Sequence, residues 1–296
     1  MTAARSALLL GLAFIYSLCF VAIKAGLAFA PPLLFAGLRA EIAGLALLAP
    51  VVAMRRPVFA LGVSALGLLA LALTSTTLAF AAMFLSPGRT GAGIASVLGN
   101  LQPLFVIVLA AAFLGEMLTR AKLAAIAFGL GGVTLIALPA MAGPDAYGIS
   151  GPLLAIGASV SFAVGNIVLK RIGGRADVLP MTAWQLVAGG LPLLALSALV
   201  ERGGAIDWTP EFAALLLALA LGGTALPFLA WNGLARREEI GRLTLLLFIV
   251  PVFGVALAAL IFGERLGTRE LAGLAAAVAG VGIALRDSVH ATSARA

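Results

Sequence analysis

Three ionisable side chains lie within long apolar stretches near the start of the chain, namely Lys24, Arg39 and Glu41. A charged group among apolar side chains is costly unless it meets an opposite charge or faces water. Arg39 and Glu41 are two residues apart and so lie on different faces of a helix, and we expect Glu41 to meet either Lys24 or Arg39. Two interpretations stay open. The charges form a structural salt bridge, with Lys24 alternatively reaching a polar surface, or they contact a solute or coupling ion.

A second group combines amide, hydroxyl, thioether and aromatic side chains that lie away from the ends of the apolar runs. An amphipathic solute needs donors and acceptors for its polar ends and apolar or aromatic walls for its body. Singly, the amides also suit contacts between helices, and the tryptophans suit a membrane interface. As a set, they are the candidate solute-binding residues: Tyr16, Ser17, Phe80, Met83, Asn100, Gln102, Asn166, Trp184, Gln185 and Trp231.

Pro103 and Pro251 each fall inside an apolar run. An internal proline removes a backbone donor and frees a carbonyl one turn earlier, which makes both positions candidate hinges, with a static kink as the alternative. Glu116 and Glu264 end the same two runs. We expect these carboxylates to cap helices or to form salt bridges with nearby arginines.

The elements that position these residues must be membrane helices. Of 296 residues, 62% are hydrophobic and 10% charged, and the mean hydropathy is +1.16. A soluble domain cannot hide so much apolar surface, and a helix of about 20 apolar residues crosses a bilayer. Ten spans are expected near residues 6–29, 33–53, 58–83, 90–113, 121–139, 150–170, 179–199, 211–233, 240–262 and 268–285.

The basic residues predict how these spans are oriented. Net charge is +7, but the Lys and Arg residues form short clusters between apolar runs, without the basic domain that nucleic-acid binding needs. Thirteen fall in loops and tails on one side of the predicted spans and four on the other. The excess marks the cytoplasmic side, so both termini are expected in the cytoplasm.

The two halves of the chain resemble each other. At an offset of 148 residues Phe80 aligns with Phe228 and Pro103 with Pro251, and at an offset of 146 Arg39 aligns with Gln185. Two repeats of five spans each must enter the membrane from opposite sides, which is the inverted-repeat plan of secondary transporters. The predicted organisation is residues 1–146, residues 147–288 and a polar cytoplasmic tail at residues 289–296.

Several stretches resemble the EamA-type permeases of the drug/metabolite transporter superfamily. They are YSLCFVAIK at residues 16–24, Gly37 to Arg39, LQPLFVIVLAAAFLGE at residues 101–116 and IVPVFGVALAALIFGE at residues 249–264. The resemblance implies a multi-pass protein of the bacterial inner membrane. Taken as a whole, the chain is similar to the exporters of aromatic and other neutral amino acids in that family.

The function expected from these features is alternating-access transport of a small neutral or aromatic amino acid or similar metabolite, with export implied by the resemblance. Sugar phosphates, nucleotide sugars and drug-like solutes remain alternatives, as does a channel or structural protein. An enzyme is disfavoured because the one histidine, His290, lies in the polar tail and no nucleophile with a base is evident. No cofactor is expected. The expected partners are the solute and membrane lipid, and small residues in spans five and ten suit a homodimer contact or scaffold packing.

Overall fold

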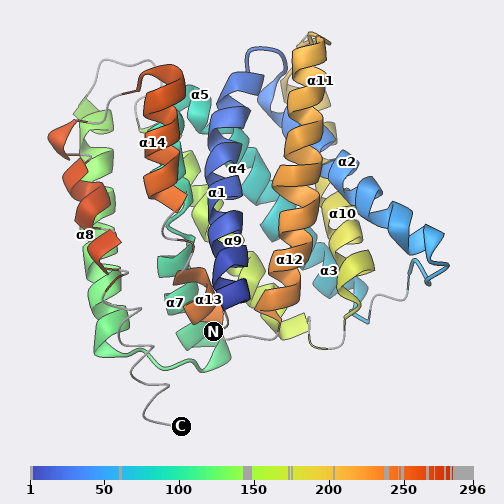
Figure 1. The fold of residues 1–296 in the computed structure, drawn as a ribbon, viewed down its shortest axis with the longest axis horizontal. Coiled ribbons are helices and arrows are strands. Elements are labelled where there is room, and N and C mark those ends of the chain that lie inside the picture. The colour runs from blue at the N-terminus through green and yellow to red at the C-terminus, as the bar shows by residue number, and fades with distance from the viewer. Residues whose placement is uncertain are drawn as a thin grey trace.

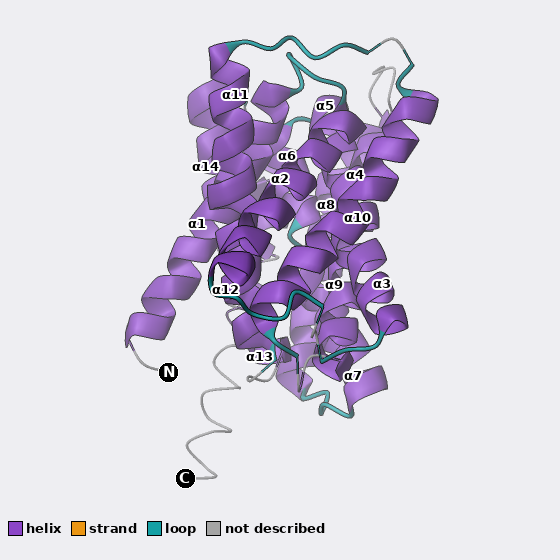
Figure 2. Cartoon of the chain, turned by 90° about the vertical axis from the view of Figure 1, so that its right-hand side faces the viewer, coloured by secondary structure: helices purple, strands orange, loops and turns teal. Residues whose placement is uncertain are grey.

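The computed structural model describes residues 3–59, 62–142, 149–172, 174, 176–202, 204–236, 240–245, 247, 250–264, 267–269, 271–276, 278–280 and 282. Within these residues all regular structure is helical, as Figure 2 shows. The predicted tail at residues 289–296, including His290, lies outside the described residues.

Figure 1 shows the order of the helices along the chain. In order they are α1 (Ala3–Gly26), α2 (Pro32–Ala53), α3 (Ala65–Ala72), the π-helix η1 (Leu73–Leu78), α4 (Ala79–Leu85), α5 (Pro87–Thr90), α6 (Ala92–Gly99), α7 (Gln102–Leu114), α8 (Arg120–Ala142), α9 (Ser150–Ile172), α10 (Val178–Val200), α11 (Pro210–Leu217), the π-helix η3 (Ala218–Ala225), α12 (Leu226–Ala235), α13 (Ile240–Leu245) and α14 (Val250–Phe262). Residues 271–276 and 278–280 are also helical.

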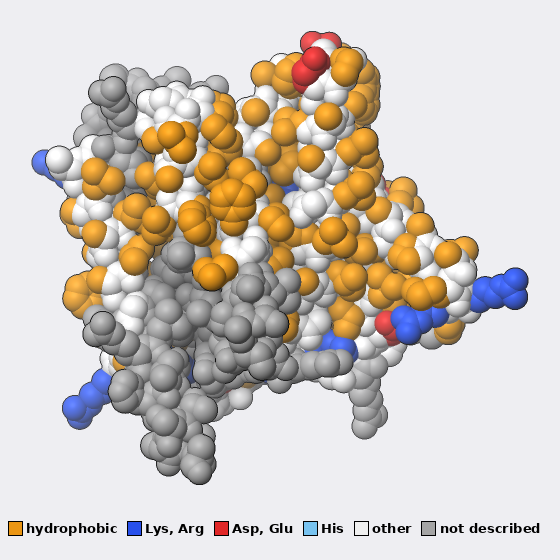
Figure 3. Space-filling model, viewed as in Figure 1, with side chains coloured by type: hydrophobic (Ala, Val, Ile, Leu, Met, Phe, Trp, Pro, Cys, Tyr) orange, Lys and Arg blue, Asp and Glu red, His pale blue; other side chains and the backbone are white. Residues whose placement is uncertain are grey.

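Six of the described helical segments are long and apolar enough to cross a membrane: Pro32–Ala53, Ala65–Thr90, Ala92–Leu114, Ser150–Ile172, Val178–Val200 and Pro210–Ala235. Hydrophobic side chains cover most of the described surface in the view of Figure 3. Large exposed side chains such as Leu66, Leu226 and Leu260 suit a surface covered by lipid. The all-helical membrane fold is therefore confirmed, while the total of ten spans and the cytoplasmic termini stay predictions.

The third span begins later than predicted. The expected range was residues 58–83, but the helix starts at Ala65 and helical backbone continues to Thr90. Gly62 has a positive φ, and the Ser64 side chain accepts a hydrogen bond from the Gly67 N–H as the N-cap of α3. Hydropathy alone does not reveal this cap, because the preceding residues are as apolar as the helix.

The second helices of the two predicted repeats, α2 and α10, form the most extensive contact between elements. Glycine makes the close approach possible. A Cβ on Gly44 would lie 2.9 Å from the Ala183 carbonyl oxygen, and a Cβ on Gly37 would lie 2.6 Å from Leu194. The two helices therefore pack closely along their length.

The span that contains Pro103 is interrupted rather than kinked. Helix α6 ends at Gly99, and α7 starts at Gln102 with Pro103 in its first turn. The predicted loss of an internal hydrogen bond is therefore wrong at this proline, since a first-turn N–H has no partner within the helix anyway. The hydroxyl of Ser159 on α9 donates to the Leu98 carbonyl at 2.8 Å and accepts from the Leu101 N–H at 3.1 Å, which satisfies the break.

Glu264 joins three segments at one end of the bundle. Its carboxylate accepts hydrogen bonds from the backbone N–H groups of Ala92 at 2.9 Å and Gly93 at 2.8 Å, at the N-terminus of α6. It also forms an ion pair with Lys24 of α1. The expected pairing of Lys24 with Glu41 is therefore wrong. Helix N-termini favour carboxylates, and a carboxylate that also meets Lys24 fixes α1 to both halves of the chain.

The same contacts set the titration of Glu264. Burial raises the pKa of this carboxyl, but the hydrogen bonds from Lys24, Gly93 and Ala92 outweigh burial, and the net pKa lies below its ordinary value of 4.5. A carboxyl with a lowered pKa in the folded state contributes stability at neutral pH, and this contribution is lost as the pH falls through the pKa of the folded state.

We expect Glu264→Ala to lower the stability of the detergent-solubilised protein by about 2 kcal/mol, because it removes the ion pair and both backbone acceptors. Glu264→Gln should lose about half as much, since the amide oxygen still accepts an N–H but carries no charge. Thermal unfolding at pH 7 and at pH 4 measures both effects, and the difference between wild type and Glu264→Gln should shrink at pH 4. An Ala variant as stable as wild type would contradict the assignment.

Candidate functional site

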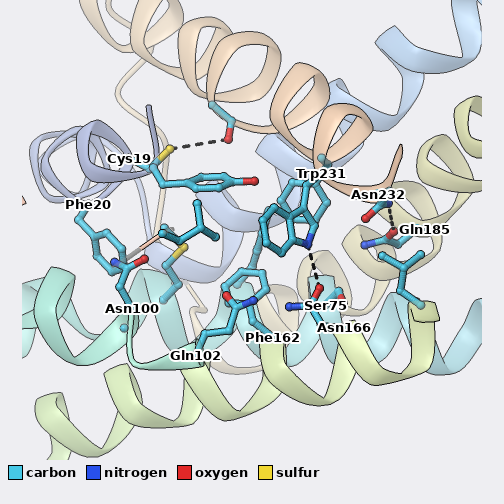
Figure 4. A pocket seen from close by; sticks show the side chains of 18 of the residues that line it. Cys19, Phe20, Ser75, Asn100, Gln102, Phe162, Asn166, Gln185, Trp231 and Asn232 are labelled. Carbon is cyan, nitrogen blue, oxygen red and sulfur yellow. Dashed lines mark hydrogen bonds between the residues drawn. The ribbon is translucent and has the colours of Figure 1, made fainter. Parts of the chain in front are cut away.

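A cavity lies between helices of the two predicted repeats (Figure 4). The first repeat contributes residues of α1, α2 and α4, and the second contributes residues of α9, α10 and α12. Its wall combines aromatic rings, amides and one guanidinium. The lining residues are Tyr16, Cys19, Phe20, Arg39, Ser75, Phe80, Met83, Gly99, Asn100, Gln102, Phe162, Asn166, Leu169, Gln185, Gly223, Phe228, Trp231, Asn232 and Leu247. The free space between these atoms is about 750 Å³, part of it open to solvent.

Eight of the ten candidate solute-binding residues line this cavity: Tyr16, Phe80, Met83, Asn100, Gln102, Asn166, Gln185 and Trp231. They come from six helical elements and the α6–α7 break, so the fold gathers side chains that are far apart in the sequence. Whether each of them touches a solute stays a prediction.

Ser17 and Trp184 do not line the cavity. The Ser17 hydroxyl is fully buried and donates to the carbonyls of Ala13 at 2.8 Å and Val250 at 2.9 Å. Val250 is the first residue of α14, so this serine ties α1 to the start of that helix. The Trp184 indole N–H donates to the Val58 carbonyl at 3.0 Å, and its ring stacks on Phe59 at 5.2 Å. Trp184 thus fixes the segment before α3.

The two π-helices bring backbone and hydroxyl groups to the cavity. In η3, the Thr224 hydroxyl donates to the Leu219 carbonyl five residues earlier at 3.0 Å, and Gly223 faces the cavity. In η1, Ser75 lies in the cavity wall. Short π-helical segments widen the turn and loosen the regular backbone pairing, and they are frequent at functional sites.

Aromatic rings from the two predicted repeats meet beside the cavity. Phe80 and Phe228, which the repeat alignment pairs, lie with ring centroids 5.8 Å apart at 90°. Phe162 contacts both rings, at 6.3 Å from Phe80 and 6.5 Å from Phe228. Edge-to-face aromatic contacts of this kind are stabilising and give the cavity a firm apolar wall.

An amide cluster occupies the right-hand part of the cavity in Figure 4, where Asn232 and Gln185 face each other and Trp231 points to Asn166. The Asn232 amide donates to Gln185 at 2.9 Å and to the Thr182 hydroxyl at 3.0 Å. The Trp231 indole N–H donates to the Asn166 carbonyl oxygen at 2.8 Å. These bonds hold the side chains in fixed orientations, and donors and acceptors remain available at the cavity surface.

Arg39 is 2% exposed and lines the same cavity. Its Nε donates to the Thr224 hydroxyl at 2.5 Å, and its Nη2 donates to the Gly223 carbonyl at 3.0 Å and the Cys19 sulfur at 3.3 Å. The guanidinium carbon also lies 5.1 Å from the centre of the Phe80 ring. All of these partners are uncharged.

Glu41 is not the partner of Arg39, so that expected pairing is wrong as well. Its Oε1 is buried without a hydrogen-bond partner among the described residues, and it lies against Gly190 of α10 rather than in the cavity wall. The two-residue spacing explains the separation, because it turns Arg39 toward the cavity and Glu41 toward the α2–α10 contact.

Several residues of the cavity wall were not predicted from the sequence. Phe228 was detectable, because it aligns with Phe80, and Asn232 follows Trp231 directly. Gly223 and Ser75 give no signal in the sequence, since their position depends on the π-helical turns. The others are Cys19, Phe20, Gly99, Phe162, Leu169 and Leu247, which read as ordinary apolar helix residues. Among the described residues no group of three or more His, Cys, Asp or Glu side chains is placed to hold a metal ion.

Comparison with known proteins identifies the kind of chain that builds this cavity. The profile of the EamA-like transporter family matches it twice, over residues 6–138 and 149–286. A relative from Salmonella typhimurium, described as a probable amino-acid metabolite efflux pump, is 34% identical over 278 residues, covering 90% of each chain. The uncharacterized transporter YvbV of Bacillus subtilis is 31% identical over 281 residues, covering 91% of this chain and 88% of the relative.

A solved crystal structure shares the fold, with a TM-score of 0.74, 18% sequence identity, and coverage of 96% of this chain and 98% of the other. The fold similarity thus extends over almost the whole of both chains. Together with the family match over both halves and the relatives above 30% identity, it leads to one conclusion. The chain belongs to the EamA-like transporter family.

Proposed function

We propose that the protein is a secondary transporter that exports small neutral or aromatic amino acids, or similar metabolites, across the bacterial inner membrane by alternating access. The observation that carries the proposal is the cavity between the two predicted repeats, with its amide cluster and aromatic wall. Transporters built from two repeats bind their solute at the repeat interface. The names of the Salmonella typhimurium and Escherichia coli relatives, probable amino-acid metabolite efflux pumps, support the solute class and the direction.

The charges in and near the cavity favour amino acids over phosphorylated solutes. A sugar phosphate or nucleotide sugar needs several cations around its phosphate oxygens. Among the described lining residues Arg39 is the one that carries a charge, and Lys24 is engaged by Glu264 outside the cavity. A zwitterionic or singly charged solute matches this arrangement better.

Counterflow in liposomes tests the proposal directly. Purified protein should exchange radiolabelled phenylalanine or another neutral amino acid saturably, because alternating access exposes one site to each side in turn. Unlabelled neutral and aromatic amino acids should compete. An unsaturable flux would point to a channel, and the absence of exchange with any amino acid would reject the proposed solute class.

Two tryptophans provide a matched pair of substitutions for the same assay. Trp231→Phe should raise the half-saturation concentration about fivefold, because the variant loses the indole N–H that orders Asn166 at the cavity. Trp184→Phe removes the same group outside the cavity and should leave this concentration unchanged within about twofold.

The break next to Pro103 and the first turn of α14, which contains Pro251, are proposed as hinges for alternating access. Pro103→Ala restores a backbone N–H, whose hydrogen bond would stabilise a continuous, straight helix by about 1 kcal/mol. Bending at this point then costs more, and turnover should slow about fivefold. Solute affinity should hardly change, because neither proline lines the cavity. Pro251→Ala should behave alike, whereas Pro210→Ala, at the exposed start of α11, is the control. Normal turnover in both hinge variants would reject the idea.

Glu41 is the candidate group for coupling solute transport to a proton gradient. We propose facilitated or weakly proton-driven transport, since this carboxylate lies in the α2–α10 contact rather than in the cavity wall. Glu41→Gln should therefore keep the rate with and without a pH gradient within about twofold of wild type. A folded Glu41→Gln protein that has lost transport driven by a pH gradient would show the opposite, namely proton coupling through Glu41.

A further inference from the structure

The guanidinium of Arg39, which lies in the cavity wall, has unused hydrogen-bonding capacity. Its Nε and Nη2 donate to Thr224, Gly223 and Cys19, but Nη1 is buried and has no hydrogen-bond partner among the described residues. A guanidinium has five N–H groups and never loses its charge in a protein. The two N–H groups of Nη1 are thus the ones that no described residue uses.

The positive charge of Arg39 is likewise not balanced by the protein nearby. No described carboxylate forms an ion pair with Arg39, and no described lining residue is Asp or Glu. A water molecule can satisfy an N–H group but cannot neutralise a cation, and a buried charge without a counter-charge is strongly unfavourable. The site is therefore built to receive an anionic group.

The surroundings of Arg39 hold the guanidinium still without neutralising it. The Thr224 hydroxyl and the Gly223 carbonyl belong to the π-helix η3, and a Cβ on Gly223 would lie 2.9 Å from the Cys19 sulfur. The rings of Phe80 and Phe84 lie 5.1 and 5.5 Å from the guanidinium carbon, which adds a cation–π contact. A cation fixed in this way binds an anion without first having to be ordered.

The two predicted repeats differ at this position, which sets the charge of the cavity. The alignment pairs Arg39 with Gln185, and Gln185 bonds to Asn232 in the amide cluster. One repeat thus contributes a cation where the other contributes a neutral amide. A single positive charge matches one carboxylate, whose planar oxygens fit a guanidinium.

We propose that Arg39 binds the carboxylate of the transported solute, and that the solute class is therefore monocarboxylates with an apolar or aromatic body, free amino acids included. The body of the solute lies against Phe80, Phe162 and Phe228, and its remaining polar group meets the amide cluster. This inference rests on the proposed transport function and narrows it. Amines without a carboxylate are excluded from the site.

A series of four related compounds tests the proposal on the unmodified protein. L-phenylalanine and 3-phenylpropionate carry a carboxylate, whereas L-phenylalanine amide and 2-phenylethylamine do not. The first two should inhibit counterflow of labelled phenylalanine. The other two should need at least about tenfold higher concentrations for the same inhibition. Equal inhibition by phenylalanine and its amide would overturn the assignment while leaving amino-acid transport intact.

Substitutions then connect this discrimination to Arg39. Arg39→Gln introduces the residue that the second repeat has at the aligned position. It should lower the affinity for the carboxylate compounds at least about tenfold, so that phenylalanine is no longer preferred over its amide. Arg39→Lys keeps the charge and should retain part of the preference. Arg56→Gln removes a positive charge from an exposed residue and is the matched control, with the preference unchanged. A full preference in Arg39→Gln would reject the role of Arg39.

Binding in detergent separates this inference from the transport proposal. If no amino acid is exchanged in liposomes, the proposed function fails, but thermal stabilisation by 3-phenylpropionate and not by phenylalanine amide would still support the carboxylate site. The same measurement in sulfate medium, with and without chloride, identifies an inorganic occupant. Stabilisation by chloride with no preference between the organic compounds would assign Arg39 to a structural anion and overturn the proposal. If Arg39→Gln does not fold, the compound series on wild type decides.

Discussion

Water is absent from the interior of a bilayer, so a membrane helix can be interrupted only where other side chains satisfy the freed backbone groups. This constraint governs the central part of the structure. Ser159 of α9 closes the break between α6 and α7, and Ser17 of α1 bonds to the carbonyl at the start of α14. Glu264 accepts the first N–H groups of α6. Without Ser159 and Glu264, backbone groups at the ends of α6 and in the α6–α7 break would be unsatisfied in an apolar medium.

Each of these side chains bonds to the backbone of the other predicted half of the chain. Ser159 and Glu264 lie in the second predicted repeat and serve the first, and Ser17 lies in the first and serves the second. These contacts therefore join the two halves at the ends of helices. Any rearrangement of one half against the other would have to exchange these polar contacts.

The two predicted repeats contribute both like and unlike side chains to the cavity. Phe80 and Phe228 remain equivalent and meet ring to ring. Arg39 and Gln185 do not, since one repeat places a guanidinium beside the π-helix η3 and the other places an amide beside Asn232. The two predicted repeats enclose the cavity together and give it unlike polar side chains.

Much of this protein follows from the sequence by itself. Its hydropathy determines an all-helical membrane protein, because only a bilayer accommodates so much apolar side chain. Amide, aromatic and thioether side chains within apolar runs predicted eight residues of the cavity wall, since amides are costly against lipid and a solute site also needs apolar walls. Only the tertiary structure decided the rest. Lys24 pairs with Glu264, 240 residues away, rather than with Glu41, and Trp184 binds the segment before α3 instead of facing the cavity. Spacing along a helix tells which face a residue occupies, but its partner depends on which distant helix packs against that face, and local sequence does not encode that choice.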